Sequence, residues 1–309
     1  MSSNLPGSPL SRETTYTPLQ IKHGLTAGIL GYCIWGLFPL YFKALDAIDD
    51  LEVLAYRIFF SFILLVGLIL FWGQWKEFLR CFRNKAMLGA LLISTLMITL
   101  NWGLFIYAIG IQQTKSASLG YYINPFVNVA LGVVLLGERL KYLHRWALAF
   151  AALGVGWMII QKFQIPWISL VLAFSFGMYG LVRKRSGITP LLGLAVETAL
   201  VSPLALGYLM YRHQVAGLGL STGTSIEVAL LLGTGLLTTV PLFLFNFGAL
   251  RIPYSMMGFL QFITPTLHFV CAIVVFGEPF SLHEWISFGF IWIGLGFFVA
   301  QAFAPKPNP

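Results

Sequence analysis

The sequence is poor in charged residues: Asp, Glu, Lys and Arg make up only 10% of its 309 residues. A soluble domain carries about 25%, because its surface must face water. With 58% hydrophobic and 16% aromatic residues, this chain has too few charges to cover such a surface. The composition excludes a soluble enzyme, a disordered protein and a nucleic-acid binder, and it predicts a protein embedded in a lipid bilayer.

Residue patterns that build catalytic, metal or phosphate sites are also missing. The three cysteines lie far apart, and the five histidines are scattered without metal-ligand or nucleophile–base spacing. No glycine-rich phosphate-binding motif is present. We therefore expect no metal, no cofactor and no enzymatic activity. An integral-membrane enzyme that acts on lipid-like molecules is the alternative.

Long apolar runs dominate what the sequence does contain. A helix needs about 20 mostly apolar residues to cross roughly 30 Å of hydrocarbon, and the runs are too continuous for barrel strands. We expect an all-α membrane protein with ten transmembrane helices. These helices are predicted at residues 24–42, 51–72, 87–109, 117–136, 143–160, 165–182, 191–211, 227–249, 253–276 and 284–303.

Lys and Arg are distributed unevenly among the predicted loops. With the N-terminus inside, 14 of the 19 fall in cytoplasmic segments, four fall outside, and Arg57 lies within a span. An excess of Lys and Arg marks the cytoplasmic side, so both termini are predicted to lie inside. The net charge of +8 is then a topology signal. Residues 1–22 are expected to be a disordered cytoplasmic tail, and residues 304–309 a second cytoplasmic tail.

The two halves of the sequence match each other at an offset of 140 residues. The Ile-Asn-Pro stretch at 123–125 recurs as Ile-Thr-Pro at 263–265, and the Gly-Glu pair at 137–138 recurs at 277–278. Because five spans is an odd number, the second copy would enter the membrane from the opposite side. Inverted repeats of this kind suit alternating access around a central site. The two five-helix repeats are predicted at residues 23–162 and 163–303.

Eight sequence blocks carry a resemblance to a known family. They are IWGLFPLYFKAL (34–45), NWGLFIYAI (101–109), SLGYYINPFVN (118–128), LGERL (136–140), AFSFGMYGLVRK (173–184), TTVPL (238–242), GFLQFITPTL (258–267) and GEPF (277–280). Through these blocks the chain resembles the ten-helix EamA branch of the drug/metabolite transporter (DMT) superfamily, and within it a group described as chloramphenicol-sensitivity proteins. The resemblance implies a multi-pass permease of the bacterial inner (plasma) membrane, with a central cavity lined by helices of both halves.

Two prolines lie about eight residues into the fourth and ninth spans, namely Pro125 and Pro265. Proline removes a backbone hydrogen bond, and helices interrupted at matching places in two repeats point to a binding site. Polar residues at helical spacing accompany both prolines, so each set shares one helix face. These residues are Tyr121, Asn124 and Asn128 in the first half and Gln261, Thr264 and His268 in the second. We expect the two faces to form a neutral, hydrogen-bonding cavity for a small-molecule substrate.

Further cavity candidates are aromatic residues and one buried amide. They are Trp35, Trp102, Tyr107, Tyr122, Phe262 and Asn101. Each polar candidate has a packing alternative, because interhelical hydrogen bonds also hold membrane helices together. For Asn128 this alternative is equally expected, and His268 is more often a core histidine than a ligand.

Two ionisable residues remain inside spans, Arg57 and Glu197, at equivalent positions of the two repeats. A charge at the bilayer centre costs roughly 2.5–3.5 kcal/mol on insertion scales, so each needs a partner or a function. Entry from opposite sides leaves them about 12 Å apart along the membrane normal. We predict two separate gating or coupling anchors: Arg57 toward Glu52 or a substrate carboxylate, and Glu197 toward Lys184 or Arg251. For Glu197, proton coupling and a structural pairing both stay open.

The sequence therefore predicts a secondary transporter that exports small metabolites or drugs by alternating access. A passive channel is a further alternative. The expected partners are a small-molecule substrate and the lipid bilayer, with no nucleic acid, and a homodimer stays open. The substrate, the direction of transport and the coupling ion are not specified by the sequence.

Overall fold

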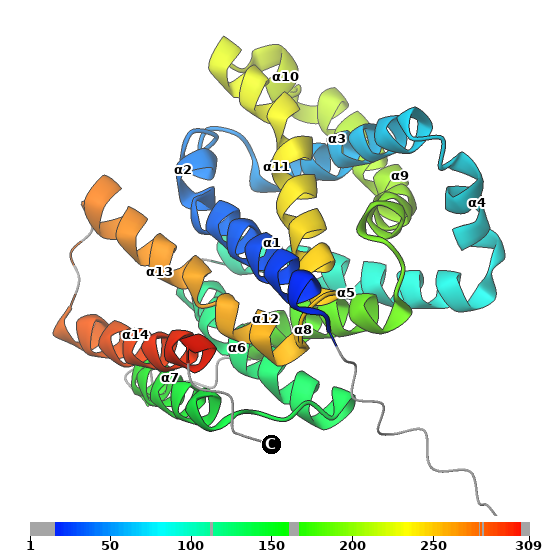
Figure 1. The fold of residues 1–309 in the computed structure, drawn as a ribbon. Helices are drawn as coiled ribbons and strands as arrows, with labels where there is room; N and C mark the ends of the chain where they lie inside the picture. Colours follow the sequence, from blue (N-terminus) through cyan, green and yellow to red (C-terminus); the bar gives the residue numbers. More distant parts are fainter. Residues whose placement is uncertain (1–15, 112–113, 161–166, 278, 280, 304–309) are drawn as a thin grey trace, which may run out of the picture.

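The computed structural model describes residues 16–111, 114–160, 167–277, 279 and 281–303, so most of both predicted tails lies outside it. Within these residues every regular element is a helix (Figure 1). The helices are α1 (Pro18–Gly36), α2 (Phe38–Lys43), α3 (Asp50–Phe71), α4 (Trp75–Arg83), α5 (Lys85–Gly110), α6 (Thr114–Leu136), α7 (Tyr142–Ile160), α8 (Trp167–Ser186), α9 (Pro190–Ala216), α10 (Gly219–Thr222), α11 (Ser225–Ala249), α12 (Tyr254–Leu260), α13 (Ile263–Val270) and α14 (Leu282–Phe303), with a π-helical turn at Cys271–Val275.

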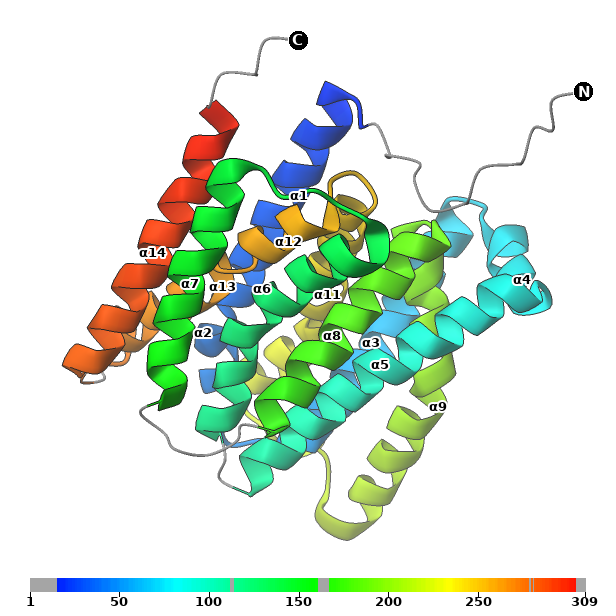
Figure 2. The same cartoon turned by 90° about the horizontal axis from the view of Figure 1, so that it is seen from below.

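Nine helical stretches of the described chain are long and apolar enough to cross a membrane. They correspond to nine of the ten predicted spans, with α1 and α2 forming one stretch and α12, α13 and the π-helical turn forming another. The remaining predicted span, 165–182, falls on α8. This helix packs along α5 and α6 (Figure 2), but its last turn consists largely of basic residues and it is not among the nine. The tenth crossing stays a prediction, as does the orientation of the termini.

Local sequence signals explain where several helices begin and end. Thr17 starts α1 and Thr224 starts α11 with a reciprocal capping box, while the Asp49 side chain accepts the Glu52 backbone N–H at the start of α3. These side chains satisfy backbone N–H groups that have no partner within the helix. At the two positions of the repeated Gly-Glu motif, Gly137 and Gly277 have φ values of 68° and 65°, which favour glycine.

The two prolines affect their helices differently. α6 continues through Pro125, whereas the ninth predicted span breaks at Gln261 and Phe262, between α12 and α13. Pro265 has no N–H to bond the Gln261 carbonyl, and the Thr264 N–H bonds that oxygen instead at 3.1 Å. The expected interruption at matching places is therefore present in one half only.

The helices pack in pairs around a central space. α7 and α14 lie side by side at one edge of the molecule in both views, α1 packs on α11, α3 packs on α9 and α11, and α6 packs on α8 and α12 (Figures 1 and 2). The α7–α14 contact is close because glycines line it. A Cβ atom at Gly154 would lie 2.5 Å from the Ser287 carbonyl oxygen, and one at Gly294 would lie 2.6 Å from the Ala147 carbonyl oxygen. Small residues let membrane helices approach in this way.

Candidate functional site

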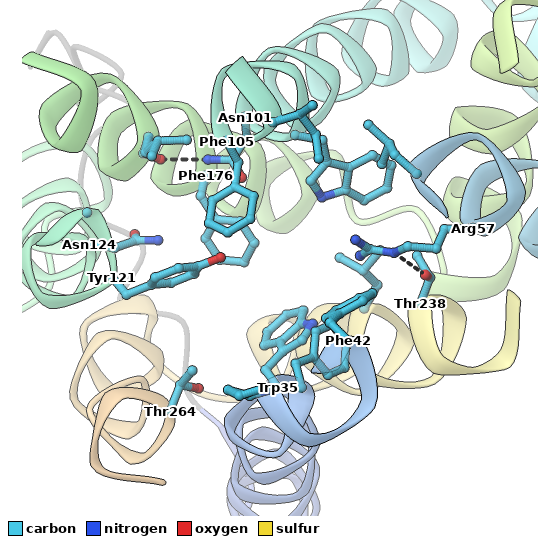
Figure 3. A pocket seen from close by; sticks show the side chains of 18 of the residues that line it. Trp35, Phe42, Arg57, Asn101, Phe105, Tyr121, Asn124, Phe176, Thr238 and Thr264 are labelled. Atoms are coloured by element: carbon cyan, nitrogen blue, oxygen red, sulfur yellow. Dashed lines mark hydrogen bonds between the residues drawn. The ribbon is translucent and has the colours of Figure 1, made fainter. Parts of the chain in front are cut away.

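A cavity of about 370 Å³ lies at the centre of the helix bundle, within the size range of roughly 300–1,000 Å³ typical of small-molecule sites. Its walls come from α1, α2, α3, α5, α6, α8, α11 and α13, so both halves of the chain contribute. Figure 3 shows the labelled side chains arranged around the open space. The lining residues are Tyr32, Trp35, Phe38, Pro39, Phe42, Asp50, Val53, Leu54, Arg57, Asn101, Trp102, Phe105, Ile106, Gly120, Tyr121, Asn124, Leu172, Phe176, Thr238, Leu242, Gln261, Thr264 and His268.

The structure brings nine of the sequence-predicted site residues to this cavity. They are Trp35, Arg57, Asn101, Trp102, Tyr121, Asn124, Gln261, Thr264 and His268. Seven others do not line it: Tyr107, Tyr122, Pro125, Asn128, Phe262, Pro265 and Glu197. Tyr107 is exposed, Tyr122 packs on Phe288, and Phe262 is buried against Phe126.

Aromatic rings form much of the cavity wall. Trp35 packs edge-on against Phe176, with ring centroids 5.7 Å apart, and Phe105 packs edge-on against Tyr121 at 6.0 Å. The Tyr121 ring in turn meets the His268 ring at 5.8 Å. Such edge-to-face contacts hold rings in fixed orientations. The cavity therefore presents flat aromatic surfaces from α1 and α8 and from α5 and α6.

The polar residues of the cavity are mostly fixed by hydrogen bonds to the backbone. Asn101 Nδ2 donates to the Leu172 carbonyl at 2.8 Å, Thr264 Oγ1 donates to the Tyr32 carbonyl at 3.0 Å, and His268 Nε2 lies 3.1 Å from the Trp35 carbonyl oxygen. These bonds leave part of each polar group facing the cavity.

Asn124 differs from the other polar residues. Its Oδ1 atom is buried and has no hydrogen-bond partner among the described residues. A buried unpaired amide oxygen is costly. The amide nitrogen is the end of Asn124 that faces the open space (Figure 3).

The predicted polar faces of the two halves do face each other, one turn away from the cavity. Asn128 Nδ2 donates to Gln261 Oε1 at 2.7 Å, and the Tyr254 hydroxyl lies 3.0 Å from Asn128 Oδ1. Asn128 is fully buried. It therefore takes the interhelical role that was its packing alternative, while Gln261 reaches both the cavity and this contact.

Arg57 projects into the cavity from α3 (Figure 3). Its Nε–H donates to Thr238 Oγ1 at 3.0 Å, and the guanidinium carbon lies 5.2 Å from the Phe42 ring centroid, 5.7 Å from that of Trp102 and 5.8 Å from that of Phe38. These distances are typical of cation–π contacts. Arg57 is thus held by a hydroxyl and three aromatic rings.

The pairing of Arg57 with Glu52 was wrong. Glu52 instead lies 3.4 Å from Arg212 Nε and accepts the Gly219 backbone N–H at 2.6 Å. Residues five apart on a helix point about 140° away from each other, so Glu52 and Arg57 face different neighbours.

Glu197 lies in a second, separate polar cluster. Its Oε1 is 3.3 Å from Arg183 Nε and accepts from Ser94 Oγ at 2.5 Å, while the Tyr179 hydroxyl donates to Oε2 at 3.3 Å. Asn246 Nδ2 donates to the same tyrosine oxygen at 2.8 Å. No ion pair joins this cluster to Arg57 in the described part of the chain, as the sequence predicted.

The predicted partners of Glu197 were wrong. Lys184 donates to the carbonyls of Ala249 and Ile252 at 2.5 and 2.6 Å, and Arg251 lies over the ring of Phe247. Successive residues on a helix point about 100° apart, so only Arg183 of the basic cluster at the end of α8 turns toward Glu197.

Sequence reasoning also missed several lining residues. Phe38 and Phe42 lie on the short helix α2, and Thr238 lies in the middle of α11. The first two follow a break at Leu37, and Pro39 in this stretch was the signal that could have located it. Among the residues that the structure describes, no three His, Cys, Asp or Glu side chains are grouped as metal ligands would be.

Comparison with known proteins supports a transporter fold. One solved protein crystal structure aligns with 91% of this chain and with 98% of its own chain, at 18% sequence identity. Its TM-score of 0.69 shows that the two chains share a fold. Residues 22–160 match the model of the EamA-like transporter family.

Relatives of similar length include proteins named as transporters and proteins named RarD. An uncharacterized transporter of Pseudomonas aeruginosa is 41% identical over 91% of this chain and 95% of its own length. Protein RarD of Escherichia coli is 35% identical over 92% and 96% of the two chains. A chloramphenicol-sensitive protein RarD of P. aeruginosa is 28% identical over 88% and 92%. With its many apolar helices, the chain is an integral multi-pass membrane protein and belongs to the EamA family of transporters, among relatives that include RarD.

Proposed function

We propose that this protein is a secondary transporter of the bacterial inner membrane that exports small metabolites or drugs by alternating access. The observation that carries the proposal is the central cavity of about 370 Å³, whose polar and aromatic walls come from both halves of the chain. A site between two halves is where rocking of one half against the other would expose a substrate to each side in turn.

Reciprocal packing supports the division into two inverted repeats at residues 23–162 and 163–303. Gly154 packs against Ser287, and Gly294 packs against Ala147. Gly294 is the repeat equivalent of Gly154, and Ser287 is that of Ala147, because 140 residues separate the members of each pair. Such exchange of equivalent partners is what a two-fold relation between two units produces. The helices follow the same exchange: α1 packs on α11, and their repeat equivalents, α8 and α5, pack on each other.

A dense polar layer supports a closed inner side. The cavity is lined by the first two turns of α3 and the last third of α5, so it extends toward the end where α2 joins α3. With both termini inside, that end faces the outside of the cell. Beyond the opposite end of the cavity lie the buried Arg183–Glu197 pair and the Asn128–Gln261 contact. We propose that these contacts hold the inner gate closed.

Counterflow in proteoliposomes tests this function. Purified protein is first screened for thermal stabilisation by a metabolite panel that includes chloramphenicol, because bound ligand raises stability by mass action. A stabilising compound preloaded into the vesicles should then accelerate uptake of its labelled form. A carrier shows this trans-acceleration, whereas a passive channel shows only equilibration and an enzyme shows chemical conversion.

Two neighbouring aromatic residues on α5 give a matched control. Phe105 lines the cavity, and Tyr107, two residues later, is exposed. Phe105→Ala should weaken ligand-induced stabilisation and counterflow, while Tyr107→Ala should leave both unchanged. Equal effects of the two variants would contradict a substrate site in this cavity.

A further inference from the structure

We infer that the substrate is a small organic monoanion with an aromatic or apolar body, whose carboxylate binds the guanidinium of Arg57. This inference rests on the proposed transport function, because it identifies the chemical class that the same cavity would carry.

Of the described residues that line the cavity, Arg57 is the one lysine or arginine. The ion pairs of the described residues join Lys43 to Asp46, Arg183 to Glu197, and Arg212 to Glu52, and none involves Arg57. A charged group away from bulk water is costly unless an opposite charge or hydrogen-bond acceptors compensate it. Among the described residues, the positive charge of Arg57 therefore has no ion-pair partner.

Asp50 does not supply that counterion. It also lines the cavity, but it precedes Arg57 on α3 by seven residues, which is about 10 Å along the helix axis. Seven residues are close to two turns, so the two side chains share one face of the helix. The carboxylate is exposed at the start of α3, and it adds negative charge at the rim of the cavity. A ligand with a second negative charge would be repelled there, which favours a monoanion.

The contacts of Arg57 leave its carboxylate-binding edge free. A guanidinium has five N–H donors in one plane, and here Nε–H is bonded to Thr238 while no partner is present for the four Nη–H groups in the described chain. Phe38, Phe42 and Trp102 lie around the group. Figure 3 shows the guanidinium pointing into the open space. A guanidinium held in this way can bind both oxygens of a carboxylate.

The rest of the cavity fits the remainder of such a molecule. The rings of Phe105, Tyr121 and Phe176 lie across the open space from Arg57, and the ring of Trp35 lies at its edge near Phe42 (Figure 3). These rings offer flat surfaces to an aromatic or aliphatic body. Asn124 also lines the cavity with its amide nitrogen toward the open space (Figure 3), where it would donate to a carbonyl or hydroxyl oxygen of the ligand. One charged end, an apolar middle and a weakly polar end describe a substituted aromatic or aliphatic monocarboxylate.

Matched pairs of charged and neutral probes test this substrate class on the purified full-length protein. The probes are 3-phenylpropanoate and benzoate, each compared with its primary amide, and chloramphenicol as an uncharged aromatic compound. Binding is measured as the ligand-induced shift in thermal stability at millimolar concentration. We expect the carboxylates to stabilise the protein and the amides to bind roughly ten- to hundred-fold more weakly, the factor expected for hydrogen bonds to a charged group.

Variants of Arg57 separate charge from shape. Arg57→Gln should lose carboxylate binding by a similar factor while retaining its weak amide binding, and Arg57→Lys should recover only part of the affinity because the planar fork is gone. Arg251→Gln is the matched control, since Arg251 also lies over an aromatic ring but outside the cavity. If the amides bind the wild-type protein as well as the carboxylates, if no carboxylate binds, or if Arg57→Gln binds the carboxylates as tightly as the wild type, the inference is wrong.

Counterflow distinguishes this failure from failure of the proposed function. Trans-acceleration with a neutral probe but with no carboxylate would leave the transporter intact and overturn the anion inference. Carboxylate binding that depends on Arg57 but gives no counterflow would support the anion site and overturn the transport proposal.

Discussion

Replacing Arg183 with methionine is expected to lower the free energy of unfolding by about 3–5 kcal/mol, the cost of leaving one partner of a buried ion pair uncompensated. The side chains of Arg183 and Glu197 are 2% and 4% exposed, and Nε and Oε1 are 3.3 Å apart. At an effective dielectric constant of about 20, two unit charges at this distance attract by about 5 kcal/mol. Loss of that attraction leaves Glu197 with only the hydroxyls of Ser94 and Tyr179.

The double variant should be more stable than the single one. Arg183→Met with Glu197→Gln removes both charges, and the glutamine can still accept the bond from Ser94. We expect it to recover about 2–3 kcal/mol of the loss, because neutral replacement of a buried pair is often well tolerated. Denaturant titration in mild detergent, followed by helical circular dichroism, measures these differences.

An exposed arginine provides the control for this cycle. Arg83→Met, at the end of α4, should change stability by no more than about 0.5 kcal/mol. If Arg183→Met behaves like this control, or if the double variant is no more stable than Arg183→Met, the buried ion pair does not stabilise the fold.

Two smaller predictions follow from the packing. Gly154→Ala should destabilise the protein by about 1–3 kcal/mol, because the new Cβ would lie 2.5 Å from a carbonyl oxygen of α14. Gly156→Ala is the control, since its Cβ would meet open space and should have little effect on stability. Thermal denaturation compares the two variants. Cys81 is fully buried on α4, and burial raises the pKa of its thiol, so near neutral pH it should resist a maleimide in the folded protein and react after denaturation. Rapid labelling of Cys81 under native conditions, in a variant without the other two cysteines, would contradict that placement.

The helices were predictable from the sequence because the length of an apolar run is a direct physical requirement of a membrane crossing. Helical spacing likewise predicted that the face containing Asn128 would meet the face containing Gln261. It did not predict the depth of that contact. Spacing defines a helix face, whereas the position of a residue in the cavity or one turn beyond it depends on how the helices cross.

The partners of the charged residues were not predictable in this way. Arg183 and Lys184 are neighbours in the sequence, and only the rotation of α8 decides which of them meets Glu197. Gly193 on α9 makes room for Arg183, because a Cβ at that position would overlap the guanidinium. The aromatic cage of Arg57 was missed for a related reason: residues 24–42 were treated as one helix, and the break at Leu37 redirects α2.

The repeated Gly-Glu motif has a structural role in its first copy. Oε1 of Glu138 accepts the Tyr254 backbone N–H at 2.5 Å, and Oε2 accepts that of Ser255 at 2.7 Å. These N–H groups belong to the first turn of α12, where an intrahelical partner is missing and a negative charge is favourable. The carboxylate therefore fastens the connection between α6 and α7 to the start of the helix that leads to Gln261. The second glutamate, Glu278, lies outside the described residues.

Glu138→Ala should consequently lower the free energy of unfolding by about 1–2 kcal/mol, the usual cost of losing a helix cap. Glu138→Gln should lose roughly half as much, because its amide has one acceptor oxygen and can satisfy only one of the two N–H groups. Arg139→Ala tests the same connection with an exposed side chain and should have little effect. Hydrogen exchange of the Tyr254 and Ser255 amides is measured alongside denaturant titration. It should be fastest in the alanine variant, slower in the glutamine variant and slowest in the wild type. Equal exchange rates in all three proteins would show that the carboxylate does not hold α12.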